Sequence, residues 1–86
     1  MPFQKIWDRI IANVGQEFET VAQGLPFTYE VIHGAIRPSR ANQNIGRADF
    51  ETAYEMLRQN PKMNISNLVR GSSYVRSILT DTRIVG

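Results

Sequence analysis

The side chains best suited to chemistry in this chain of 86 residues are arginines and amides gathered in the segment 37–47. The segment reads RPSRANQNIGR and contains three arginines, three amide side chains and no acidic residue. Guanidinium groups pair with phosphate in a planar fork, and amides hydrogen-bond to phosphates and base edges. A plain alternative is a solvated loop whose polar groups satisfy its own turns. The residues predicted to bind nucleic acid here are Arg37, Arg40, Asn42, Gln43, Asn44 and Arg47.

A second basic segment, 70–76, places a glycine and two serines between two arginines. Free backbone N–H groups at the start of a helix attract anions, and flanking arginines add positive charge. The alternative is that one of the two serines simply caps a helix while Tyr74 packs inward. The residues predicted to form this second phosphate contact are Arg70, Ser72, Ser73 and Arg76.

Charge is distributed unevenly along the chain, although the formal net charge is only +2. Residues 1–34 carry two basic and four acidic groups, whereas residues 35–86 carry eight basic and four acidic groups, seven of the eight being arginines. So small a surplus is a weak signal for a polyanionic ligand, and the asymmetry also suits pairing between subunits or with a protein. We expect a binding module for DNA or RNA, with a protein-interaction module or homodimer as the alternative.

No constellation of residues indicates catalysis. The single histidine, His33, falls in a predicted turn, and the absence of cysteine excludes disulfides and thiolate zinc sites. Glu17 and Glu19 share a predicted strand face, with Glu30 opposite them, and carboxylates are the ligands that Mg²⁺ prefers, but a solvated sheet face is the favoured interpretation. Nucleophile–base pairs and phosphate-binding glycine motifs are missing. The sequence therefore predicts no enzyme activity, no metal and no cofactor.

The elements that must position the basic segments begin with a helix at the N-terminus. Apolar residues recur there at helical spacing, with Pro2 suited to the first turn and Gly15 placed as a left-handed cap. The predicted buried stripe consists of Phe3, Ile6, Trp7, Ile10, Ile11 and Val14.

Strand-type residues follow in three short segments, 17–22, 27–32 and 35–37. His33-Gly34 is predicted to form a two-residue hairpin turn, and Pro38 to end the third strand because proline cannot donate to a sheet ladder. These strands predict a three-stranded antiparallel meander. We expect one face of the second strand to carry Phe27, Tyr29 and Val31.

A second helix is predicted from a capping signal. Ile45 and Phe50 are spaced as a hydrophobic staple around Gly46, and Asn60-Pro61 marks the end of the helix. Apolar residues recur at helical spacing within this segment, and the predicted buried stripe consists of Phe50, Ala53, Tyr54 and Leu57.

The last quarter of the chain predicts a short turn closed by Gly71 and a short helix capped by Ser72 or Ser73. Ile84-Val85 is expected either to anchor the C-terminal end of the chain or to add a strand. The whole chain, 1–86, is thus predicted to be a single α+β domain. Its small three-stranded antiparallel meander would pack against an N-terminal helix and two or three C-terminal helices.

The sequence contains no apolar run of the roughly 18–20 residues that would cross a bilayer. Its first residues lack the charged leader and apolar stretch of a signal peptide. We therefore expect a cytoplasmic protein without a membrane partner.

Overall fold

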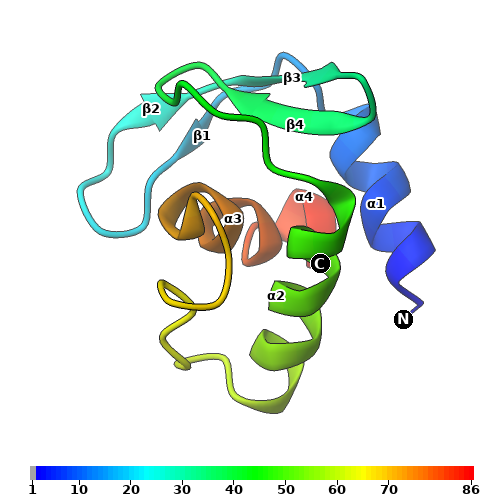
Figure 1. Cartoon of the computed structure of the whole chain (residues 1–86), viewed down its shortest axis with the longest axis vertical. Coiled ribbons are helices and arrows are strands. Elements are labelled where there is room, and N and C mark those ends of the chain that lie inside the picture. Colours follow the sequence, from blue (N-terminus) through cyan, green and yellow to red (C-terminus); the bar gives the residue numbers. More distant parts are fainter. Residues whose placement is uncertain (1) are drawn as a thin grey trace.

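The computed structural model describes residues 2–86 and has mixed helical and strand content, as predicted (Figure 1). In Figure 1 the strands lie across the top, α1 lies at one side, and the other helices lie beneath the strands. In the described residues no helix is long and apolar enough to cross a membrane. The elements are α1 (Phe3–Ala12), β1 (Phe18–Glu19), β2 (Pro26–Phe27), β3 (Tyr29–Ile32), β4 (Ala35–Pro38), α2 (Arg47–Gln59), α3 (Ser72–Leu79) and α4 (Thr82–Val85).

The strands of residues 2–86 form two antiparallel sheets of two strands each, so the predicted three-stranded meander is not confirmed. β1 pairs with β2, and β3 pairs with β4. Only Thr28 separates β2 from β3, and its backbone N–H donates to the side-chain oxygen of Ser39 at 3.1 Å. The Ser39 side chain thus accepts the bond that a neighbouring strand's carbonyl would accept in a continuous sheet. Before Thr28 the chain pairs with β1, and after Thr28 it pairs with β4. The register pairs Phe18 with Phe27, Tyr29 with Pro38, Glu30 with Arg37, and Ile32 with Ala35.

The hairpin between β3 and β4 has the predicted two-residue turn at His33-Gly34. Both residues have positive φ angles, 51° and 77°, as type I′ turns require. Such turns match the right-handed twist of the strands, and histidine tolerates the left-handed region better than most residues. β4 then ends at Pro38, also as predicted.

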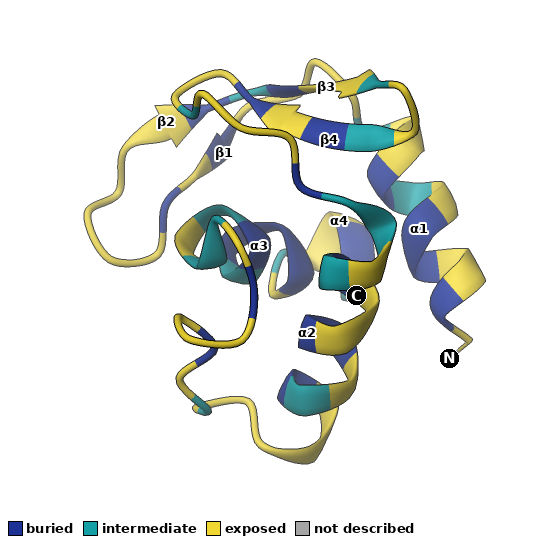
Figure 2. Ribbon diagram, viewed as in Figure 1, coloured by how far each residue is buried: buried dark blue, intermediate teal, exposed yellow. Residues whose placement is uncertain are grey.

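The buried core lies between the strands and the helices, and the elements turn their buried residues inward (Figure 2). α1 contributes Phe3, Ile6, Trp7 and Ile10, but the rest of its predicted stripe is wrong. Ile11 and Val14 are 38% and 39% exposed: Ile11 lies on α1 outside its buried face, and Val14 lies in the turn beyond the end of α1 at Ala12. Pro2 is the N-cap of α1 and so lies just outside its first turn.

Tyr29 connects α1 to the strands and lies in the core beside Phe27, as predicted. Its hydroxyl donates to the carbonyl of Ile10 at 2.6 Å, and its own carbonyl accepts from the N–H of Gly15 at 3.2 Å. Burial raises the pKa of the Tyr29 hydroxyl, which keeps it protonated as a donor. Val31, predicted on the same face, is 39% exposed and lies outside the core.

The helical half follows the predicted boundaries in part. Gly46 is the N-cap of α2 and Asn60 its C-cap, as predicted. The predicted serine cap of α3 is wrong: Gly71 occupies that position in the left-handed region, at φ 62°, and both serines lie in the first turn. The tail forms α4, with Ile84 fully buried, and adds no strand to either sheet.

An ion pair holds α4 in place. The carboxylate of Asp81 accepts hydrogen bonds from the backbone N–H and the Nε and Nη2 groups of Arg83, at 2.8–2.9 Å. The guanidinium also donates to the carbonyl of Glu17 at 2.9 Å and lies 3.8 Å from the ring centre of Phe18. The hydrogen bonds from Arg83 hold the pKa of the Asp81 carboxyl below its ordinary value.

Asp81→Ala should lower the free energy of unfolding at pH 7 by about 1 kcal/mol, because it removes the α4 cap and the partner of Arg83. A carboxyl whose pKa is lower in the folded state stabilises the fold at pH values above its unfolded pKa of about 3.9. This contribution to the free energy of unfolding is lost as the pH falls through the pKa of the folded state. The difference from the unmodified protein should therefore shrink at pH 2. Urea unfolding at both pH values measures it, with Glu55→Gln as a control in an exposed pair. An equal loss at both pH values would contradict the ion-pair explanation.

Candidate nucleic-acid interface

The first predicted basic segment forms a closed loop in the structure. Ile36 in β4 and Ile45 exchange two backbone hydrogen bonds, of 2.9 and 2.7 Å, and both side chains are fully buried. The residues between them, 37–44, leave the core and return at this pair (Figure 1). The loop is therefore anchored at its base by buried residues while its polar side chains face outward.

Arg37 lies at the start of this loop, on β4, and is exposed. It stands opposite Glu30 of β3 in the ladder, yet the two side chains form no ion pair. Within residues 2–86 the Arg37 guanidinium has no hydrogen-bond partner. It is therefore free to bind a ligand without breaking an internal contact.

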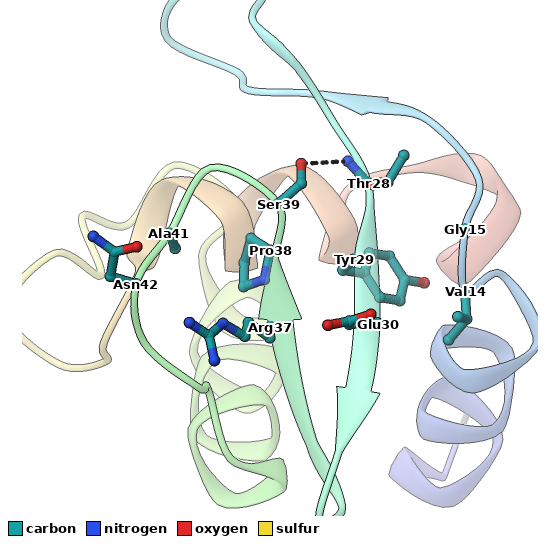
Figure 3. Close-up of a pocket in the computed structure, with 10 residues that line it drawn as sticks. All are labelled: Val14, Gly15, Thr28, Tyr29, Glu30, Arg37, Pro38, Ser39, Ala41 and Asn42. Atoms are coloured by element: carbon teal, nitrogen blue, oxygen red, sulfur yellow. Dashed lines mark hydrogen bonds between the residues drawn. The ribbon is translucent and has the colours of Figure 1, made fainter.

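A surface pocket of about 480 Å³ lies over this part of the hairpin (Figure 3). Glu30 and Arg37 reach it from β3 and β4, and Asn42 from the loop. The Ser39–Thr28 hydrogen bond holds the loop against the strand beside the pocket (Figure 3). The full lining is Val14, Gly15, Thr28, Tyr29, Glu30, Arg37, Pro38, Ser39, Ala41 and Asn42.

The remaining predicted side chains of the loop are exposed. Arg40 donates from Nε to the carbonyl of Pro26 at 2.6 Å, which ties the loop to β2 and leaves its other N–H groups without partners in the described chain. Within that same range, Asn42, Gln43 and Asn44 make no side-chain hydrogen bond. These amides therefore keep donors and acceptors available.

The second predicted segment meets the first at Gly71. A Cβ atom on Gly71 would lie 2.6 Å from Cδ1 of Ile45 and 3.7 Å from Nε2 of Gln43, so the two segments of the chain are in close contact. Arg70 precedes this contact, is exposed, and has no hydrogen bond or ion pair to any residue in the range 2–86. The structure thus places Arg70 next to the end of the loop.

Two arginines that were predicted to bind nucleic acid, Arg47 and Arg76, are instead bound to other parts of the protein. Arg47 donates from Nη2 to Gln4 at 3.0 Å, lies 3.5 Å from the carboxylate of Glu51, and covers the ring of Phe3 with its guanidinium 5.0 Å from the ring centre. Its pairing was detectable in the sequence, because Glu51 follows it at helical i,i+4 spacing.

Arg76 has a similar internal role. It donates to the backbone carbonyls of Pro61 and Met63 and so holds the irregular chain after α2. Ser72 and Ser73 line a separate pocket of about 170 Å³ beside Arg76. Neither the sequence spacing nor the charge indicated these contacts, because backbone carbonyls leave no trace in side-chain patterns.

The carboxylates also separate. Glu17 and Glu19 line a pocket of about 400 Å³ with Asp81 and Arg83, whereas Glu30 lies in the pocket beside Arg37. Among residues 2–86 no three acidic, histidine or cysteine side chains are grouped to hold a metal ion. The predicted grouping of Glu30 with Glu17 and Glu19 is therefore wrong.

Comparison with known proteins gives no match: no family model, no curated protein and no solved structure is similar to this chain.

Gly71→Ala should lower stability more than Gly15→Ala. Both glycines have positive φ angles, so each alanine costs about 1–2 kcal/mol of backbone strain. At Gly15 nothing lies within 4 Å of the new methyl group, whereas at Gly71 it would press on Ile45 and add about 1–3 kcal/mol. Urea unfolding of the two variants measures the difference, and equal losses would mean that the segments are not in close contact.

Proposed function

We propose that this protein is a non-catalytic module that binds nucleic acid. The observation that carries the proposal is that Arg37 and Arg70 are exposed and, in the described residues, have no internal partner. Arg37 begins the closed loop that carries the three unpaired amides, and Arg70 precedes Gly71, which contacts Ile45 at the closing pair of that loop. We call this set the basic loop surface; its members are Arg37, Arg40, Asn42, Gln43, Asn44 and Arg70.

Physical chemistry favours a polyanion on such a surface. Binding of phosphates by arginine releases counterions, and this term supplies most of the affinity in non-specific binding. Arg47 and Arg76 use both terminal nitrogens on internal partners and would first have to give up those bonds, so they are excluded from the proposed site. Arg40 uses only Nε internally and keeps its terminal N–H groups for a ligand. The amides then supply hydrogen bonds to phosphate and base edges. We further propose a cytoplasmic location, in keeping with a chain that has no cysteine.

The double variant Arg37→Ala/Arg70→Ala should weaken binding and flatten its salt dependence. Each phosphate contact contributes about 0.7 to the slope of log K against log salt on single strands and about 0.9 on duplexes. The slope should therefore fall by about 1.4–1.8. Fluorescence anisotropy with labelled 20-nucleotide DNA and RNA, single and double stranded, over several salt concentrations measures both quantities.

Arg58→Ala is the matched control, because Arg58 lies on α2, pairs with Glu55 and covers the ring of Tyr54. It removes one positive charge away from the basic loop surface and should change the slope little. No binding to any of the four probes at low salt would exclude the proposed function. A slope that falls half as far for this single-charge control as for the double variant would show that only total charge matters.

A second candidate function is protein association, favoured by an apolar pocket of about 380 Å³ between α2, α3 and α4. Leu57, Leu79 and Val85 line it, with Arg58 and Thr80 also contributing. If this pocket mediates self-association, light scattering after gel filtration should show a dimer that Val85→Glu converts to monomer. A monomer at all concentrations for the unmodified protein would exclude the homodimer.

A further inference from the structure

The pocket between β3, β4 and the basic loop has features that a simple phosphate site would lack. Its polar groups include both a guanidinium, from Arg37, and a carboxylate, from Glu30. A carboxylate repels an anion, so a ligand that offers phosphate alone would be poorly accommodated. The ligand that fits must present an anionic group and a hydrogen-bond donor together.

Both charged side chains keep their bonding capacity. Glu30 and Arg37 are cross-strand partners, and directly opposed residues have Cβ atoms about 4.5–5.5 Å apart. They nevertheless form neither an ion pair nor a hydrogen bond with each other, and within residues 2–86 neither has another partner. In Figure 3 the Arg37 side chain extends toward the loop that carries Asn42, while the carboxylate of Glu30 lies closer to the strands. The two charges are thus available to different parts of one ligand.

The size and the remaining walls of the pocket suit a nucleotide. Its volume of about 480 Å³ falls within the range of about 300–1,000 Å³ found for small-ligand sites. Val14 and Ala41 contribute apolar atoms to its lining. Asn42 adds an amide that both donates and accepts.

We infer that this pocket takes one nucleotide of a single-stranded nucleic acid and selects a base with an exocyclic amino group, cytosine over thymine or uracil. Glu30 accepts from the amino group of the base, and Arg37 binds the phosphate. Cytosine presents an N4 amino donor where thymine and uracil present the O4 acceptor, which a carboxylate repels. The inference rests on the proposed function, because the pocket would read a strand held by the basic loop surface.

The test compares labelled 12-nucleotide oligomers of cytosine with those of thymine, and of cytosine with uracil in RNA, by fluorescence anisotropy at one salt concentration. The unmodified protein should bind the cytosine oligomers at least about fivefold more tightly, the discrimination given by about 1 kcal/mol. In Glu30→Gln the ratio should fall to about one, since an amide can donate to O4 as readily as it accepts from N4.

Glu19→Gln is the matched control, because it removes one exposed carboxylate from β1, outside this pocket. It should keep the preference for cytosine. Thermal unfolding of both variants confirms that the fold is retained.

The outcomes separate the two proposals. Equal binding of all oligomers by the unmodified protein would overturn the base-selective pocket and leave the proposed function standing. A cytosine preference that survives Glu30→Gln would overturn the role of Glu30. Absence of binding to every oligomer would overturn this inference, and the proposed function would be overturned with it only if the duplex probes also fail to bind.

Discussion

The backbone pair between Ile36 and Ile45 is the constraint on which the arrangement of the polar surface depends. Two hydrogen bonds between fully buried residues bring the end of β4 beside the start of α2 and close the chain between them into a loop. A loop of eight residues that begins and ends in the core cannot also bury its polar groups without partners, so they face the solvent. Ile45 also packs against Gly71, which brings Arg70 to the same place.

Most of the arginines have structural work in this fold. Arg9, Arg40, Arg76 and Arg83 each donate to a backbone carbonyl of a segment distant in sequence. Irregular segments leave carbonyls without partners, and a small domain without disulfides needs side chains to satisfy and hold them. An arginine-rich composition is therefore largely explained by the fixing of loops and of the C-terminal helix. Within residues 2–86, Arg37 and Arg70 are the arginines whose guanidinium groups have neither a hydrogen-bond nor an ion-pair partner.

The break between β2 and β3 bears on the pocket as well as on the sheet. At Thr28 the backbone N–H donates to the hydroxyl of Ser39, while the carbonyl accepts from the backbone N–H of the same serine, and both residues line the pocket beside Arg37. The pairing partner of the chain changes from β1 before Thr28 to β4 after it, so the break in the predicted sheet lies among residues that line the candidate pocket.

The sequence by itself determined the local elements: the helix carrying Trp7, the I′ turn at His33-Gly34, and the start of α2 at Gly46. These follow from periodicity, turn chemistry and capping, which depend on neighbours in the chain. Local spacing indicates the pairing of Arg47 with Glu51, but only the tertiary structure decided that Arg9, Arg40, Arg76 and Arg83 are engaged, since their partners are backbone carbonyls far away in sequence. The same holds for Glu30, which strand alternation placed on a face but which the fold set beside Arg37 and Asn42. Contacts of that kind depend on how the elements meet, and no local pattern encodes them.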